Sequence, residues 1–385
     1  MQLGSEILLA SNRLDGLRVG VLANPASVDR HFRHIVDLLA ASPDSKLTAI
    51  FGPQHGFRSD LQDNMIETPH TNDPKRGVPI FSLYSETREP TPEMLSLIDV
   101  LVIDLQDVGA RIYTFIYTMA NCMAACARAG VPVVICDRPN PIGGYGIEGP
   151  MLEPGYESFV GQYPIPMRHS MTVAELAQFF NGEFALGAEL EVVPMEGWAR
   201  RMYFDETDVP WIMPSPNMPT LDTAFVYPGT VLFEGTQLSE GRGTTRPFEL
   251  IGAPWLDGEA LAARMNDVGL AGVYFRPAIF EPTFQKHTRA TCGGCQMHVL
   301  RRDDFDPVIA GVALLRECYA LAPGQFKWRD PPYEYEHDKM PVDILAGSPT
   351  LREQIESQVP LREISESWLP GEAAFDERRR PYLLY

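Results

Sequence analysis

Short apolar runs that polar residues barely interrupt constrain the fold of this chain more than any other feature of its sequence. Strands covered on both faces show such continuous runs, whereas strands with one face in water alternate apolar and polar residues. Segments with helical periodicity separate the runs, as they do where helices connect parallel strands. The runs are 18–24, 47–51, 78–84, 99–105, 131–136 and 190–194. They predict a parallel sheet with helices on both faces.

The segments between these runs complete an α/β pattern. The longest of them is apolar and is followed by Gly130, a common signal for the end of a helix. The predicted helices are 31–41, 92–98, 112–129 and 172–184. We therefore expect a Rossmann-like α/β domain over residues 1–230.

After residue 230 the pattern changes, beginning with a stretch rich in glycine and threonine. A helix is predicted over 258–268, strands over 273–280 and 296–300, and a further helix over 307–320. Residues 328–335 are rich in aromatic residues and proline, and they are expected to pack as an extended arm. We expect residues 231–385 to form a smaller α+β domain.

Charge and cysteine usage narrow the class of protein. The 385-residue chain carries a net charge of −19, which argues against nucleic acid and anionic lipid as partners. It has no run of about 18 apolar residues, so no membrane span is expected. The first residues lack the pattern of a signal peptide, and the six cysteines fit a reduced protein. We expect a cytoplasmic location, or a periplasmic or secreted one if a signal has been removed.

Polar residues gather where the predicted strands end, and in an open parallel sheet these ends share the edge at which ligands bind. Acids, tyrosines and asparagines suit a sugar, because its hydroxyls need paired donors and acceptors and its flat face stacks on aromatic rings. The alternative is that these residues only form turns and helix caps. The candidates are Asn24, Gln54, His55, Asp104, Asp107, Arg111, Tyr113, Tyr117, Arg138, Asn140, Asn217, Glu240 and Arg242.

Two loops and a cysteine pair bear on cofactors. Residues 239–245 lack the P-loop pattern and residues 24–26 lack the dinucleotide fingerprint, so neither a nucleotide phosphate nor NAD is expected. Cys292 and Cys295, with His287 and His298 nearby, have the residue types that bind zinc. Free thiols in a turn are the favoured interpretation, and no cofactor or metal is expected.

Several longer stretches are specific enough to compare with known proteins. They include VLANPASV (21–28), LTAIFGPQHGFR (47–58), IDLQDVGARIYTFIYTM (103–119), DRPNPIGG (137–144) and EGTQLSEGRGTTRPFELIGAPW (234–255). In these stretches the chain resembles the NamZ-type exo-β-N-acetylmuramidases. The resemblance implies a Rossmann-like domain, a smaller α+β domain and a cleft between them. It also implies release of N-acetylmuramic acid from the non-reducing end of peptidoglycan fragments, without a nucleotide or metal cofactor.

The chain departs from this family at one position that bears on catalysis. The family pattern is usually Gly-Pro-Glu-His, and its glutamate is the proposed catalytic acid, but here the residue is Gln54. A carboxamide does not donate a proton as a carboxylic acid does. The chain is therefore an inactivated variant, a natural branch with its acid elsewhere, or a protein that binds without cleaving. The replacement candidates are Asp60, Asp63 and Glu67, followed by Asp104, Asp107 and Glu240.

The other candidates have paired interpretations. His55 is expected either to hydrogen-bond the leaving oxygen or orient residue 54, or only to hold its own loop. Asp104 and Asp107 are expected to orient substrate or activate water, or to form an ion pair with Arg111 that shapes the cleft. Tyr113 and Tyr117 are four residues apart and are predicted to share one face of a helix.

N-acetylmuramic acid carries a lactyl carboxylate, which a planar guanidinium binds through two hydrogen bonds. Arg138 and Arg242 are the candidates for this contact, and Lys286 and His287 are alternatives from the second domain. Arg138 could instead only tie its turn to neighbouring loops.

The leading hypothesis is a glycosidase that acts on muramic-acid sugars with a modified acid. A muropeptide-binding protein that has lost catalysis is the second hypothesis. An enzyme acting on another anionic carbohydrate is the third.

Overall fold

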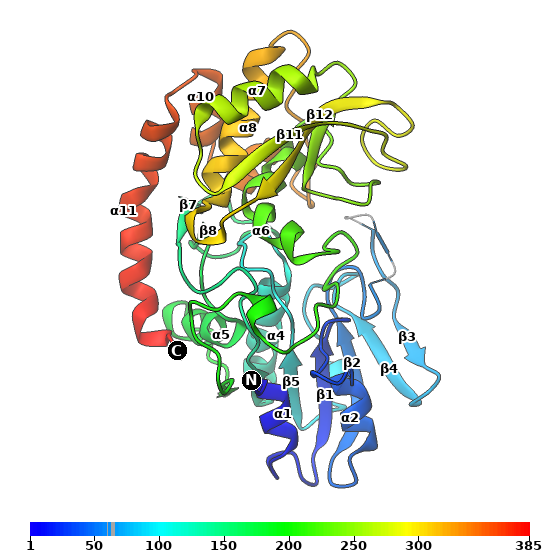
Figure 1. Cartoon of the computed structure of the whole chain (residues 1–385). Helices are drawn as coiled ribbons and strands as arrows, with labels where there is room; N and C mark the ends of the chain where they lie inside the picture. The colour runs from blue at the N-terminus through cyan, green and yellow to red at the C-terminus, as the bar shows by residue number, and fades with distance from the viewer. Residues whose placement is uncertain (60, 63–65) are drawn as a thin grey trace.

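The computed structural model describes residues 1–59, 61–62 and 66–385 (Figure 1). Its larger sheet has seven strands in the order β3-β4-β2-β1-β5-β6-β9. Every neighbouring pair in it is parallel except β3 and β4 at one edge. In chain order the strands are β1 (Arg18–Ala23), β2 (Lys46–Gly52), β3 (Thr71–Asp73), β4 (Val78–Ser82), β5 (Val100–Asp104), β6 (Val133–Cys136) and β9 (Leu190–Val193).

The order of the strands is Rossmann-like. The chain runs outward from β1 through β2 to β4, returns to the other side of β1 at β5, and continues outward through β6 to β9. The direction of winding thus reverses between β1 and β5, the point at which ligands bind in many such sheets. The prediction of a largely parallel sheet is confirmed.

Helices bury both faces of this sheet, which explains why its strands read as continuous apolar runs. One apolar cluster joins side chains of the first two helices to the sheet, and a larger cluster joins those of the next three. Helix α4 ends at Gly130, which takes the left-handed conformation (φ 69°) that glycine adopts without strain. These helices are α1 (Gly4–Leu9), α2 (Ile35–Ala41), α3 (Pro92–Leu95), α4 (Phe115–Ala129) and α5 (Val173–Glu183).

The C-terminal part is built around a smaller antiparallel sheet in the order β10-β12-β11. The predicted strands and helices of this part are all present, and the fold class is confirmed. Helices α6 and α8 pack closely where Gly229 meets Pro307. A Cβ on Gly229 would lie 2.0 Å from the carbonyl oxygen of Pro307, which shows how little space separates the two helices. The elements are α6 (Leu221–Thr230), η2 (Val231–Gly235), β10 (Leu250–Ala253), α7 (Gly258–Val268), β11 (Val273–Phe280), β12 (Cys292–Val299) and α8 (Pro307–Leu321).

Several elements were not predicted from the sequence. The hairpin of β7 (Glu148–Met151) and β8 (Pro166–Arg168) is one, and α11 (Leu361–Arg379), which packs against β7, is another. Figure 1 shows α11 running beside both parts of the molecule, so that the chain ends near α5. The remaining elements are η1 (Phe204–Glu206), η3 (Arg302–Asp304), α9 (Pro341–Ala346), α10 (Thr350–Glu356) and η4 (Arg380–Tyr382). None of the described helices is long and apolar enough to cross a bilayer.

Candidate active site

A pocket lies where loops of the larger sheet meet the C-terminal part of the chain. The loop after β2, the residues before α4 and residues near 215–218 form one side of it. Residues of α6, η2 and the later loops form the other side. The lining residues are Gln54, His55, Ile112, Tyr113, Thr114, Phe115, Val160, Ser215, Asn217, Met218, Tyr227, Glu234, Arg242, Phe248, Tyr333 and Glu334.

Gln54 lies at the start of the loop that follows β2. The backbone of His55 and Gly56 is left-handed there, with φ of 69° and 81°. Such a conformation is costly for a non-glycine residue and is often found at functional sites. The hydroxyl of Thr114, the N-cap residue of α4, donates a 2.7 Å hydrogen bond to Oε1 of Gln54. His55 makes a 2.8 Å hydrogen bond between Nδ1 and the carbonyl oxygen of Leu61.

Glu334 reaches the same place from the C-terminal part. Its side chain forms a hydrogen bond with Gln54, and Tyr84 Oη donates a 3.0 Å hydrogen bond to Oε2 of Glu334. The residue is only 3% exposed, and both it and Tyr335 have left-handed backbone, with φ of 45° and 70°. Burial raises the pKa of the Glu334 carboxyl to about 7, and the nearby charge of Glu234 acts in the same direction.

Glu234 has the opposite electrostatic environment. Burial is the largest single effect and disfavours its charged form, but the charge and hydrogen bond of Arg242, the hydrogen bond of Tyr333 and the charge of Lys286 together hold the pKa of Glu234 below its usual value. Nη2 of Arg242 lies 2.6 Å from Oε1 of Glu234, and Tyr333 Oη donates a 2.7 Å hydrogen bond to Oε2. The pocket therefore pairs a carboxyl group whose pKa is raised with one whose pKa is lowered. We call Gln54, Glu234, Arg242, Tyr333 and Glu334 the pocket cluster.

Glu240 and Lys286 extend this network behind the pocket. Lys286 Nζ lies 2.7 Å from Glu240 Oε2, and Glu240 Oε1 lies 3.3 Å from Arg242 Nε. Lys286 also donates to the backbone carbonyls of Phe233 and Leu238. Nη1 of Arg242 is buried and has no hydrogen-bond partner among the described residues. Arg242 therefore keeps one donor for a ligand, whereas Lys286 is committed within the protein.

Three predicted residues form a separate group at the ends of β1, β5 and β6, the sheet-edge cluster, which comprises Asn24, Asp104 and Arg138. Nε of Arg138 lies 2.6 Å from Oδ1 of Asp104, and both side chains are almost completely buried. Arg138 Nη2 also donates to the carbonyl of Val28 at 2.7 Å, and Asn24 Nδ2 donates to that of Gln106 at 3.1 Å. None of the three is among the described residues that line the pocket.

Arg111 has different partners from those that the sequence suggested. Its guanidinium donates to the backbone carbonyls of Pro150, Ile165 and Leu345, at 2.7–2.9 Å. Asp104 pairs with Arg138 instead, so the predicted alternative of an Asp104–Arg111 ion pair is wrong. Arg111 thereby ties the segment before α4 to the β7–β8 region and to α9.

Asp107 and Asn140 are also bound within the protein. Asp107 Oδ2 accepts a 2.7 Å hydrogen bond from the amide of Gly109 and lies 3.4 Å from Nε2 of His169. Nδ2 of Asn140 donates to the carbonyl of Met171 at 3.0 Å. Neither residue is among those described as lining the pocket.

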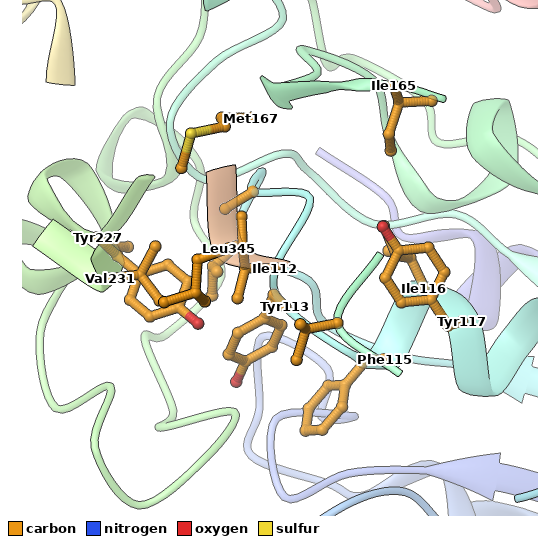
Figure 2. Close-up of a cluster of buried hydrophobic side chains, with 14 of the residues drawn as sticks. Ile112, Tyr113, Phe115, Ile116, Tyr117, Ile165, Met167, Tyr227, Val231 and Leu345 are labelled. Atoms are coloured by element: carbon orange, nitrogen blue, oxygen red, sulfur yellow. The ribbon is translucent and has the colours of Figure 1, made fainter. Parts of the chain in front are cut away.

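Tyr113 and Tyr117 do not share a helix face. Helix α4 begins at Phe115, so Tyr113 precedes it. Tyr113 lines the pocket and packs edge-to-face against Tyr227, with ring centroids 5.9 Å apart. Figure 2 shows Tyr117 directed away from this pair, toward Ile165, and its ring stacks on Phe180.

Glu67, one of the proposed replacement acids, lies outside the pocket cluster. Glu67 is half-exposed, and its Oε1 lies 3.3 Å from Arg88 and 3.4 Å from Tyr335 Oη. Asp60 and Asp63 lie outside the described residues. His287 hydrogen-bonds the carbonyl of Gln237 at 2.7 Å.

Cys292 and Cys295 lie on β12 rather than in the predicted turn. Both thiols are buried and neither forms a disulfide. Within the described part of the chain, no three His, Cys, Asp or Glu residues are grouped to hold a metal ion.

Glu334 was not identified from the sequence as a candidate. An acidic residue within an aromatic, proline-rich segment was the feature that could have indicated it. Glu234 is the first residue of the stretch 234–255 but was not named as a candidate. Tyr227, Phe248 and Tyr333 were also missed, because aromatic residues in such segments are normally core residues.

The fold and the pocket together define a class: a Rossmann-like α/β protein whose pocket holds two carboxyl groups with opposed pKa shifts, as glycoside hydrolases require. Two family descriptions match the chain, "Exo-beta-N-acetylmuramidase NamZ, N-terminal" over residues 19–222 and its C-terminal counterpart over residues 225–385. The chain belongs to the NamZ family of glycoside hydrolases.

Individual relatives agree with this membership. The peptidoglycan β-N-acetylmuramidase NamZ of Bacillus subtilis (strain 168) is 46% identical over 387 positions, covering 100% of this chain and 91% of that protein. Two crystal structures of DUF1343 family proteins from Bacteroides fragilis NCTC 9343 are also similar. One has a TM-score of 0.90 at 36% identity and the other 0.77 at 30%, and each comparison covers 100% of this chain and 98% of the other.

Proposed function

We propose that this protein is an exo-acting β-N-acetylmuramidase that hydrolyses N-acetylmuramic acid from the non-reducing end of peptidoglycan fragments. The observation that carries the proposal is the pair of carboxyl groups in the pocket, Glu334 and Glu234, whose environments push their pKa values apart. Glycosidic cleavage needs one carboxyl as acid and a second carboxylate as base, nucleophile or stabilising charge. The 46% identity to a peptidoglycan β-N-acetylmuramidase supports the substrate class.

Arg242 is the better of the two arginine candidates for the lactyl carboxylate. It lines the pocket and keeps a buried donor, Nη1, without a partner among the described residues. The guanidinium of Arg138 is occupied by Asp104 and the carbonyl of Val28. A carboxylate placed against Nη1 would form a charge-assisted hydrogen bond, which is stronger than a neutral one.

The test compares 4-nitrophenyl β-N-acetylmuramide with 4-nitrophenyl β-N-acetylglucosaminide, which lacks only the lactyl group. We expect 4-nitrophenol release from the first and far less from the second. Equal rates on both substrates would contradict a muramic-acid specificity, and absence of release from either would contradict the glycosidase.

A second candidate function is muropeptide binding without cleavage, and Gln54 is the observation that favours it. A carboxamide at the position of the family's proposed acid leaves a recognition site intact while removing one proton donor. Calorimetry with a disaccharide of N-acetylmuramic acid and N-acetylglucosamine separates the two functions. Binding in which the disaccharide stays intact over hours would support the second.

A further inference from the structure

The pocket contains a carboxyl group directly beside the carboxamide at position 54. Oε1 of Gln54 accepts the hydrogen bond from Thr114, so its amide nitrogen is the atom available to donate to Glu334. Glu334, from a distant part of the chain, thus places a carboxyl group in direct hydrogen-bond contact with residue 54. Both side chains line the same pocket.

Aromatic groups hold Glu334 in a fixed orientation. Tyr84, which donates to its Oε2, packs against Phe159 with ring centroids 5.2 Å apart and against Tyr335 at 6.3 Å. The guanidinium of Arg88 lies over both tyrosine rings, 4.3 Å and 4.7 Å from their centroids. A catalytic carboxyl needs such support because small displacements of a reacting group lower the rate strongly.

We propose that Glu334 is the general acid of this protein and protonates the glycosidic oxygen, the role that Gln54 cannot fill. This inference rests on the proposed function. The proton of the Glu334 carboxyl passes to the glycosidic oxygen as the C1–O bond breaks, and both electrons of that bond stay with the oxygen. The leaving sugar departs as a neutral alcohol. A water molecule then forms the new bond to C1 and gives its proton to a pocket carboxylate.

Glu234 suits the role of that carboxylate and of the charge that stabilises the positive sugar carbon. Arg242 and Tyr333 keep it ionised, and it also raises the proton affinity of Glu334. Groups whose environments separate their pKa values in this way divide naturally into acid and base. With a pKa of about 7, Glu334 is protonated in most molecules at slightly acid pH and loses its proton as the pH rises.

The test is the leaving-group dependence of Glu334→Gln. The substrates are the disaccharide of N-acetylmuramic acid and N-acetylglucosamine, whose leaving alcohol needs a proton, and 2,4-dinitrophenyl β-N-acetylmuramide, whose phenolate leaves without one. Loss of a general acid typically costs about 10²–10⁴-fold. We expect a loss of that size in kcat/KM on the disaccharide and a loss of less than about tenfold on the aryl substrate. We also expect the activity of the parent to fall above about pH 7, as Glu334 loses its proton, and this fall to be absent from the variant.

Glu148→Gln is the matched control. Glu148 is another buried glutamate, with a pKa raised by burial to about 8, but it caps the start of α8 outside the pocket. This variant should keep the leaving-group dependence and the pH profile of the parent. Circular dichroism of both variants checks that they are folded.

Four outcomes would overturn the assignment. Parent-like hydrolysis of the disaccharide by Glu334→Gln would exclude a general-acid role, and an equal loss on both substrates would indicate a structural one. If the parent is inactive on the disaccharide and Gln54→Glu alone cleaves it, the family activity holds but position 54 needs its own acid. If the folded parent and Gln54→Glu both leave every substrate intact, the proposed function itself fails, and the assignment of Glu334 fails with it.

Discussion

The sheet-edge cluster and the pocket cluster both place an arginine against a buried carboxylate, yet they differ in what they leave available. At the sheet edge, Arg138 and Asp104 neutralise each other, and the second arm of Arg138 is used on a backbone carbonyl. In the pocket, Arg242 neutralises Glu234 but leaves Nη1 unpaired within the described structure, and Glu334 faces a neutral amide. The first arrangement stabilises the fold, whereas the second leaves groups for a ligand.

This contrast shows why burial and charge do not identify a site by themselves. The reversal of winding between β1 and β5 is the place where a Rossmann-like sheet often binds ligands. Here Arg138 binds Asp104 and Asn24 donates to a backbone carbonyl, and the pocket lies to one side, between the loop after β2 and the C-terminal part. Whether a side chain lines the pocket separates the two clusters better than its residue type does.

The largest expected effect is on catalysis at the pocket cluster. Glu234→Gln keeps the size of the side chain but removes the charge that stabilises the positive sugar carbon. We expect kcat on the disaccharide to fall by about 10²–10⁴-fold, with the far-ultraviolet circular dichroism unchanged. A kcat within a factor of about three of the parent would mean that Glu234 only positions Arg242.

The next effect is on stability at the sheet-edge cluster. Asp104→Ala leaves the guanidinium of Arg138 buried without its counter-ion, which typically costs about 3–5 kcal/mol. We expect a loss of that size in the free energy of unfolding from urea titration, with KM of the remaining folded protein unchanged.

A double variant sharpens this prediction. Asp104→Leu with Arg138→Met replaces both charges by apolar groups, and it should recover much of the lost free energy of unfolding. A large rise in KM in either variant would instead place the sheet-edge cluster in substrate binding.

The smallest effect tests whether a raised pKa alone marks a catalytic carboxyl. Burial raises the pKa of Glu148 in the folded protein to about 8, above the value of about 4.5 that a glutamate has when unfolded. Above pH 4.5 the unfolded chain releases this proton more readily than the folded one, so stability falls as the pH rises toward 8. Glu148→Gln should remove this contribution, up to about 1.4 kcal/mol per pH unit.

The measurement is the free energy of unfolding of parent and Glu148→Gln between pH 5 and pH 8, in buffers of equal ionic strength. As the pH rises, the free energy of unfolding of the parent should fall relative to that of the variant. A difference independent of pH would mean that the Glu148 carboxyl keeps its usual pKa.

The sequence by itself determined most of the larger domain and the family. Continuous apolar runs predict parallel strands because only strands covered on both faces exclude polar residues from both, and the strands of the sheet core lie where they were predicted. The longer stretches identified the NamZ family because such a resemblance depends on the linear order of residues, which the sequence gives directly. Gln54 and Arg242 were both identified from the sequence as site candidates, and both line the pocket.

The tertiary structure alone decided which polar side chains meet. Nothing local in the sequence brings Glu334 to Gln54, since the contact depends on how the C-terminal part folds back over the sheet. The start of α4 at Phe115, rather than before Tyr113, separates two tyrosines that sequence spacing placed together. The pKa of the same residue type is lowered at Glu234 and raised at Glu334. The reason is physical: a side chain's charge state is set by its burial and its neighbours, and both are properties of the folded chain.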